Sequence, residues 1–438
     1  MEKHGARSMS EILLILFVVL IFLLIILSVD VAFAVGTVGI LWLIVADYPL
    51  TIAASRTLGS IDILVLLAIP FFILAAELMN SSEVTPKLVR IGNVTTGRIR
   101  GGLAQANVVT SMLFAGLSGS AVADVAALGS IFIPRMRDEG YDGAFSTALT
   151  AATSIVGPII PPSIILIIYG AITNTSVGAL FAAAIVPGIM LVIGMVGLVG
   201  LLAWKNDYPK YDEQFERKEY PRLIGVSLLV LTIPAIILIG IIGGFFTPTE
   251  AAVVACVWVT LIGVFVFRTL TANKVYTSLN KSILLTSQLY IIIALSGMLS
   301  WIIAREGIPQ YITDTLLGTG FEATTIMILV AIVLLILGTW LDINAAVIIL
   351  APTLTQVSVE MGIHEIQFGL IIVMSLTIGL ITPPIGLCLF AASSVSGISI
   401  GEITKKIIPF YITYMLVIGI IIYVPEATLY LPERSGLI

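Results

Sequence analysis

Charged residues are scarce in this chain. Only 11% of its 438 residues are charged and 59% are hydrophobic, whereas an ordinary soluble domain has about 25% charged residues. No soluble core could bury so much apolar surface. A net charge of -5 over this length, without a basic cluster, gives no reason to expect nucleic acid as a partner. The composition indicates a protein whose main solvent is the lipid bilayer.

Histidine is nearly absent, which argues against an enzyme. Gly116-Leu117-Ser118-Gly119 fits the G-x-S-G of intramembrane serine proteases, but a serine nucleophile needs a base within hydrogen-bond reach. The two histidines, His4 and His364, fall in polar connections. Asp124 and Asp342 lack the G-x-G-D context of intramembrane aspartyl proteases. We therefore expect no enzyme activity.

Cysteine is equally rare. Cys256 and Cys388 both lie in apolar segments, where cysteine behaves as a small hydrophobe and not as half of a disulfide framework. No cluster of His and Cys suits a transition metal. We expect no cofactor and no transition-metal ion.

Long apolar runs, in contrast, are abundant. A helix of about 20 apolar residues crosses the hydrocarbon layer. The first run follows Lys3 and Arg7 but exceeds the core of a secretory signal, which has about 7–15 residues. It is therefore expected to be a membrane helix and not a cleaved signal. The candidate spans are 12–28, 31–46, 60–79, 145–172, 177–204, 222–242, 249–268, 282–304, 366–395 and 407–425.

Two further regions, 102–135 and 323–356, are each long enough for two short helices. Small or polar residues break them at Gly116–Ser120 and at Gly338–Asp342. We expect re-entrant helical hairpins, which enter the membrane and leave on the same side. The fold class is therefore an all-α polytopic membrane protein with about 11 transmembrane helices and two hairpins.

The interruptions recur along the chain. Asp124 matches Asp342 at a spacing of 218 residues, and Gly157 matches Gly379 at 222. The Pro-Pro pairs of the two broken spans, Pro161-Pro162 and Pro383-Pro384, also match at 222, and Pro86 matches Pro309 at 223. An odd number of spans in each copy gives the inverted repeat of secondary transporters.

The predicted organisation is a first repeat over 1–204, a cytoplasmic linker over 205–221 that is expected to be a solvated arm, and a second repeat over 222–438. Each repeat has scaffold helices, a hairpin, a broken helix and a closing helix. In the first repeat these are 12–79, 102–135, 145–172 and 177–204, and in the second they are 222–304, 323–356, 366–395 and 407–425.

The distribution of positive charge indicates the orientation. With both termini outside, 16 of the 21 Lys and Arg residues lie on the cytoplasmic side, as the positive-inside rule requires. We therefore expect a multi-pass protein of the inner (cytoplasmic) membrane with both termini in the periplasm.

The four breaks are the candidate sites. A broken helix at membrane depth frees carbonyls on one side and amides on the other, which is costly unless the break lines a cavity or is buried. The starting ends of half-helices attract a carboxylate, whereas freed carbonyls and hydroxyls suit sodium. The candidate sodium ligands are Ser118, Gly119, Ser120, Asp124, Gly157 and Pro158 in the first repeat, and Gly338, Thr339, Asp342, Gly379 and Thr382 in the second.

The substrate carboxylate is expected between the hairpin tips. Prolines suit the first turn of a helix, where their missing N–H is no loss, so half-helices are expected to begin at Pro161 and Pro383, with two more after Ser120 and near Asp342. The candidate substrate residues are Ser120, Pro161, Pro162, Ser163, Thr382, Pro383, Pro384 and Ile385.

The acidic residues in the apolar regions also have structural interpretations. Asp124 and Asp342 could coordinate a cation or cap a helix. Thr247-Pro248-Thr249-Glu250 has the spacing of a capping box with proline at the first helical position. Asp30 and Glu77 lie near helix ends and are expected to be structural.

Four motifs together resemble the large membrane subunit of tripartite ATP-independent periplasmic (TRAP) transporters. They are Ser118–Asp124, Pro161-Pro162-Ser163, Thr247–Ala252 and Thr382–Gly386, in that order over essentially the whole chain. The resemblance implies an elevator mechanism, sodium coupling, a small four-helix membrane subunit and a periplasmic substrate-binding protein. It also implies an organic acid as substrate, such as a C4-dicarboxylate, sialic acid, another sugar acid or a keto acid.

No four-helix block precedes the resemblance, so the chain is expected to be the unfused form. We expect the small subunit on scaffold helices at 12–46 and 222–268, and the binding protein on periplasmic connections at 47–58, 243–248, 305–322 and 357–365. The polar rim there would consist of Asp47, Arg56, Arg305, Glu306 and Glu322. The alternative is a stand-alone sodium/carboxylate symporter that needs no binding protein.

Overall fold

The computed structural model describes residues 16–438 apart from 18, 83, 97–98 and 211–219. Within these residues the chain is helical, with one isolated β-bridge between Arg100 and Lys210 and no strand. Six of the described helices are long and apolar enough to cross a membrane, and seven shorter apolar helices accompany them. The all-α polytopic fold is confirmed.

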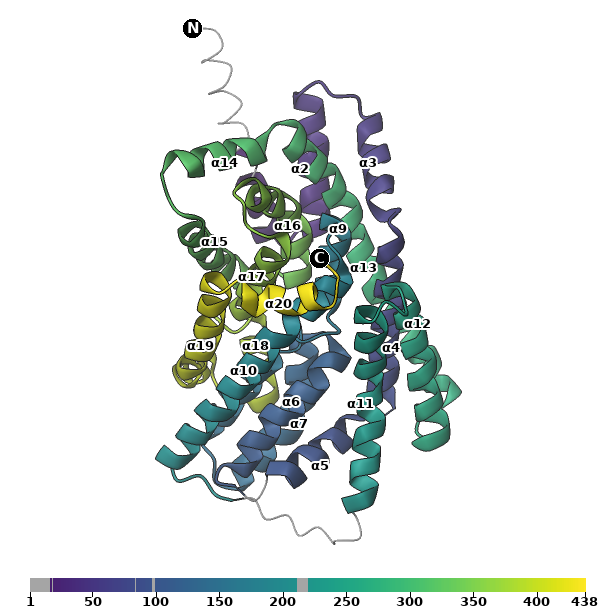
Figure 1. The fold of residues 1–438 in the computed structure, drawn as a ribbon, viewed down its shortest axis with the longest axis vertical. Helices are drawn as coiled ribbons and strands as arrows, with labels where there is room; N and C mark the ends of the chain where they lie inside the picture. Colours follow the sequence, from purple (N-terminus) through teal and green to yellow (C-terminus); the bar gives the residue numbers. More distant parts are fainter. Residues whose placement is uncertain (1–15, 18, 83, 97–98, 211–219) are drawn as a thin grey trace.

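Five helices pack into a scaffold layer, and most of this layer lies on the right in Figure 1. Their ends are capped: the Asp30 carboxylate accepts from the Ala32 N–H, and Thr247 and Glu250 form the expected capping box. The scaffold helices are α2 (Val31–Val45), α3 (Thr51–Ile61), α4 (Ala68–Ser81), α12 (Pro248–Leu261) and α13 (Ala272–Arg305). Three flanking elements are the 3-10 turn η1 (Leu64–Leu67), α11 (Tyr220–Ile242) and the π-helical turn η2 (Ile262–Val266). The α3 helix was not predicted.

Two short amphipathic helices connect the scaffold to the rest of the molecule. They are α5 (Val84–Thr96) and α14 (Ile308–Gly318), and they lie near opposite ends of the molecule in Figure 1. Neither helix was predicted from the sequence, although the matched prolines Pro86 and Pro309 fall in their first turns.

The remaining helices form a second body. Its first hairpin is α6 (Gly102–Ser118) with α7 (Ala121–Asp138), and its first broken helix is α8 (Gly143–Ser154) with α9 (Ile164–Thr173). The second hairpin is α15 (Ala323–Gly338) with α16 (Ile343–Glu360), and the second broken helix is α17 (Glu365–Gly379) with α18 (Leu387–Ser396). The closing helices are α10 (Val177–Lys205) and α19 (Ile400–Tyr423).

The hairpins and broken helices of the two halves interlock. Helix α18 packs on α7 and α8, and α16 packs on α9. A short helix that was not predicted, α20 (Glu426–Arg434), crosses α10 (Figure 1). Because each half-helix lies against the hairpin of the other half, the four breaks belong to one packed unit.

The described start of the expected solvated arm is packed in part: Lys205, Asp207 and Lys210 are exposed, whereas Tyr208 and Pro209 contact the rest of the molecule. Tyr208 is only 9% exposed and stacks on Tyr141 with ring centroids 4.6 Å apart. The carbonyl of Pro209 accepts hydrogen bonds from the Gly101 N–H and the Tyr141 hydroxyl. Burial raises the pKa of Tyr208 and of Tyr141 to about 12. The start of the linker is therefore packed against the base of the first hairpin; residues 211–219 lie outside the described ones.

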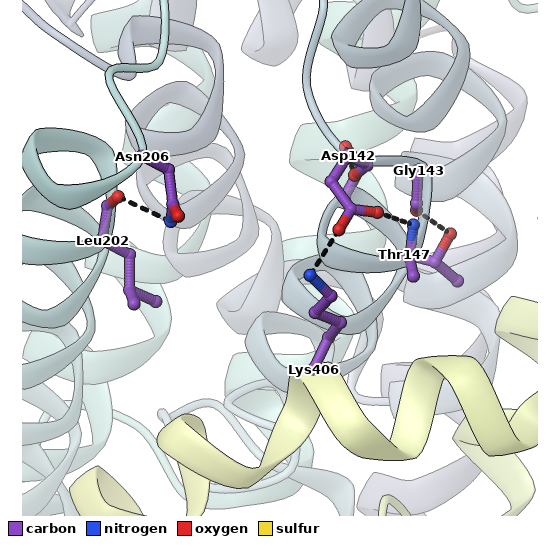
Figure 2. A network of polar contacts seen from close by, with 8 residues as sticks. Asp142, Gly143, Thr147, Leu202, Asn206 and Lys406 are labelled. Atoms are coloured by element: carbon purple, nitrogen blue, oxygen red, sulfur yellow. Dashed lines mark hydrogen bonds and ion pairs between the residues drawn. The ribbon is translucent and has the colours of Figure 1, made fainter.

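An ion pair joins the α7–α8 connection to α19 at the same end (Figure 2). Asp142 caps α8 by accepting from the Ala144 N–H, and its Oδ2 lies 2.5 Å from Lys406 Nζ. Burial acts to raise the pKa of Asp142, but the hydrogen bonds from Lys406 and Ala144 outweigh it, and the pKa is lowered.

We expect this ion pair to stabilise the folded state by an amount that changes with pH only in the acidic range. A lowered folded-state pKa means that stability is present above the unfolded value of about 4 and is lost as the pH falls through the folded value. Asp142→Asn should lower stability by less than about 1 kcal/mol, because both groups are partly exposed. Thermal unfolding should show a constant deficit from about pH 6 to 8 that shrinks below about pH 4. A deficit that disappears by about pH 6 would contradict this assignment.

Candidate functional site

The first hairpin turns in only two residues, Gly119 and Ser120. Gly119 has a φ of +62°, which favours glycine, and an ideal Cβ there would lie 3.2 Å from Ile164 Cδ1. Ser120 caps α7 by accepting from the Ala123 N–H at 3.4 Å, and its side chain is exposed. The tip therefore touches the start of α9, and a half-helix begins after Ser120 as predicted.

Asp124 lies one turn inside α7 and faces the first break. Its side chain is 1% exposed, and an ideal Cβ on Gly157 would lie 2.8 Å from its Oδ2. The same Cβ would lie 3.9 Å from Ala115 Cα, at the end of α6. The structure thus brings together the first hairpin, Asp124 and Gly157, which the sequence placed in one cation site.

The first break is a buried loop between α8 and α9. Ser163 caps α9 through the Leu166 N–H, and its hydroxyl donates to the carbonyl of Pro158 at 2.5 Å. The Pro161-Pro162 bond is cis, and both prolines precede the cap. The prediction that they form the first helical turn is wrong, because Ser163 is the cap and α9 begins only at Ile164.

The second tip is longer and closer to its break. Gly338 and Gly379 pack backbone against backbone, with no room for a Cβ on either. The Gly386 N–H donates to the carbonyl of Thr339 at 3.2 Å, and the Thr382 hydroxyl donates to that of Ile378 at 2.8 Å. This tip and this break are therefore also in direct contact.

The second Pro-Pro pair also differs from its prediction. Helix α18 begins only at Leu387, after Gly386, so Pro383 and Pro384 precede the helix and do not form its first turn. Their peptide bond is cis, and both prolines are exposed, whereas the matching pair of the first break is buried. Ile385 is half-buried between them and Gly386. The two breaks are thus unequal in exposure.

Asp342 differs from Asp124 although the two match in sequence. It is exposed and caps α16, where its Oδ1 accepts from the Asn344 N–H at 3.0 Å and the Ala345 N–H at 3.3 Å. The first hairpin uses Ser120 as its cap, four residues before Asp124. The prediction that this residue could cap a helix is confirmed for Asp342. Asp124 is the acidic side chain that faces a break.

Two tyrosines of α19 donate hydrogen bonds to backbone carbonyls in or beside the two breaks. The Tyr411 hydroxyl donates to the carbonyl of Ile381 in the second break at 2.7 Å, and Tyr414 donates to Ala152, at the end of α8, at 2.6 Å. Residues three apart share a helix face, so both breaks lie on one side of α19. These tyrosines were missed, although polar side chains in an apolar span were a possible signal.

The expected periplasmic rim is only partly a free surface. Arg305 is exposed, but Glu306 Oε1 accepts hydrogen bonds from Trp42 Nε1 at 3.1 Å and from the Tyr48 hydroxyl at 3.2 Å. Glu306 therefore ties the end of α13 to the α2 region. Among the described residues there is no group of three or more His, Cys, Asp and Glu that could hold a metal ion.

The sequence matches a known family over nearly its whole length. The family model described as "Tripartite ATP-independent periplasmic transporter, DctM component" matches residues 14–427. The chain belongs to this DctM family. It is therefore a TRAP large permease, a transport protein and not an enzyme.

Similar proteins include large permeases of stated substrates. The sialic acid TRAP transporter large permease protein SiaM of Vibrio cholerae is 35% identical to this chain. The matched region covers 93% of this chain and 95% of SiaM. The C4-dicarboxylate large permease DctM of Pseudomonas aeruginosa is 38% identical over 85% of this chain and 87% of its own. The isethionate TRAP permease DctMQ of Oleidesulfovibrio alaskensis is 32% identical over 93% of this chain and 64% of its own.

A solved structure shares the fold. The YdaH transporter of Alcanivorax borkumensis superposes with a TM-score of 0.59, over 84% of this chain and 86% of its own. Its sequence is only 15% identical, so the similarity concerns the fold alone.

Proposed function

We propose that this TRAP permease couples sodium entry to the uptake of an organic acid that a periplasmic binding protein delivers. One observation supports this most strongly: each hairpin tip touches one helix break, and α19 hydrogen-bonds beside both breaks through Tyr411 and Tyr414. Such paired junctions of freed carbonyls, hydroxyls and half-helix ends are the arrangement in which transporters bind cations and anions together.

The first sodium site is assigned to the tip around Ser118 to Ser120 with Asp124, Gly157 and Pro158. The observation behind it is the buried Asp124 carboxylate against Gly157. The second site is assigned to Gly338, Thr339 and Asp342 with Gly379 and Thr382, where backbone groups dominate. Oxygen ligands of this kind suit a hard monovalent cation.

The substrate anion is assigned to the space between the tips, near Ser120 and Thr382. Sialic acid, C4-dicarboxylates and isethionate, which are named for similar permeases, all carry an anionic group. Half-helices begin after Ser120 and Ser163, and the positive end of a helix dipole favours an anion. Pro383 and Pro384 of the second break are exposed, and we assign them to the same site.

We also propose an elevator motion, and the packing of the helices into a scaffold layer and a second body supports it. The hairpin body would slide against the scaffold, and the connecting helices α5 and α14 would change their angle. We assign the small membrane subunit to scaffold surfaces at 12–46, of which 12–15 and 18 lie outside the described residues, and at 222–268, where side chains such as Val257 and Phe265 are exposed. Both termini are assigned to the periplasm of an inner-membrane protein, and Arg305 to the docking surface of the binding protein.

Bulky substitutions at the tips test this site. Ser120→Trp and Thr382→Trp should each abolish uptake, because the added ring would fill the space assigned to the substrate. The measurement is uptake into proteoliposomes with the small subunit and binding protein present, at matched levels of inserted protein. Leu416→Trp on the exposed side of α19 is the matched control and should transport normally. Wild-type uptake by both tip variants would place the substrate elsewhere.

A further inference from the structure

A buried polar network joins the first hairpin to the first broken helix. Asn107 of α6 is fully buried, and its amide Nδ2 donates to Thr150 Oγ1 of α8 at 2.7 Å. Its Oδ1 accepts from the hydroxyls of Ser111 and Thr153 at 3.3 and 3.4 Å, and these hydroxyls lie 3.0 Å apart. None of these residues belongs to the sites assigned above.

The corresponding helix pair packs without such a network. From Ile326 to Gly338 the matching hairpin arm α15 carries only apolar side chains and glycine, and it packs directly on α17. At the spacing of 222 residues, Ile372 stands where Thr150 does, and Ser375 stands where Thr153 does. Among the described residues the buried Ser375 hydroxyl has no hydrogen-bond partner. The same contact between hairpin and broken helix thus forms from apolar residues, so packing alone does not explain the polar network.

The network lies one helical turn away from the contact between the first hairpin and the first break. Ser111 is four residues before Ala115 and Thr153 is four residues before Gly157, and Ala115, Gly157 and Asp124 meet at the break. A fully satisfied buried network fixes one arrangement of the helices that carry it. The register of α6 on α8 therefore sets how far the hairpin tip lies from the carbonyls of the break.

We propose that Asn107 is a positioning residue for the first cation site. It holds α6 and α8 in register through Thr150, Thr153 and Ser111, so that the groups around Asp124 and Gly157 are preorganised for the ion. The inference rests on the proposed sodium coupling. A looser register would weaken cation binding at the first site and leave the second site and the translocation rate largely unchanged.

The test compares Asn107→Leu with Gln105→Leu, which lies on the same helix. Gln105 is also buried and makes one hydrogen bond between helices, from Nε2 to the carbonyl of Val196 at 2.9 Å. Asn107→Leu should raise the sodium concentration for half-maximal uptake about three- to tenfold with a nearly unchanged maximal rate. Gln105→Leu should leave the sodium dependence at the wild-type value. Thr150→Val should move it in the same direction as Asn107→Leu, and the double variant should add little.

Sodium-dependent thermal stabilisation of the purified protein, against potassium, gives a second readout that does not need transport. Here too Asn107→Leu should need more sodium than Gln105→Leu. Equal sodium dependence in Asn107→Leu and wild type, or equal shifts in Asn107→Leu and Gln105→Leu, would overturn the inference alone. A wild-type protein with no sodium-dependent step would instead overturn the proposed function, and this inference with it.

Discussion

Replacing Gly379 with alanine should abolish uptake. An added Cβ would meet the backbone of Gly338, and backbone atoms cannot move aside as a flexible side chain can. Overpacking of this kind costs about 1–3 kcal/mol, and here it would also separate the second hairpin tip from its break. Uptake in proteoliposomes should fall to background while the protein still inserts into the membrane.

A matched glycine serves as the control. Gly419 lies in α19 of the same body, and an ideal Cβ there meets no atom within 4 Å. Gly419→Ala should therefore transport like the wild type. Normal uptake by Gly379→Ala would mean that close approach of the second tip and break is unnecessary, and the second cation site would have to be placed elsewhere.

Replacing Asp124 with asparagine should have an effect of comparable size. The substitution keeps the shape but removes a buried negative charge at the first break, and intramembrane carboxylates usually mark ion sites. We expect the sodium concentration for half-maximal uptake to rise at least about tenfold, equivalent to about 1.4 kcal/mol of binding free energy. The measurement is uptake as a function of sodium concentration.

Asp342→Asn is the informative comparison, because the two aspartates match in sequence. Asp342 is exposed and caps α16, and asparagine caps a helix about as well as aspartate. Asp342→Asn should therefore shift the sodium dependence much less than Asp124→Asn. The reverse order of effects would show that the second tip, and not the first, supplies the charged ligand.

Features encoded by local rules were predictable from the sequence. Clusters of proline, glycine and polar residues in apolar runs indicated all four breaks, because such clusters favour the interruption of a helix. Single prolines such as Pro134 and Pro187 lie inside unbroken helices. The capping box of Thr247 and Glu250 was equally readable, since its spacing alone defines it. The pairing of each tip with its own break followed from the duplicated pattern.

Features that depend on packing were not predictable. Asp342 caps α16 as Ser120 caps α7, whereas Asp124 lies one turn inside α7 against Gly157. Which of the two aspartates faces a break depends on contacts between helices. The connecting helices α5 and α14 are short and only partly apolar, so a search for long apolar runs passes over them. The network around Asn107 and the α19 tyrosines depends on contacts between distant segments.

The central claim is that a sodium gradient drives uptake of a delivered organic acid through the two junctions. The most direct measurement is uptake into proteoliposomes containing this permease and its small subunit, with a panel of radiolabelled organic acids and the cognate binding protein. We predict accumulation of one acid when sodium is high outside, and none when potassium replaces sodium or when the binding protein is omitted. Equal accumulation without a sodium gradient would contradict the account, and full uptake of free acid without the binding protein would indicate a stand-alone symporter.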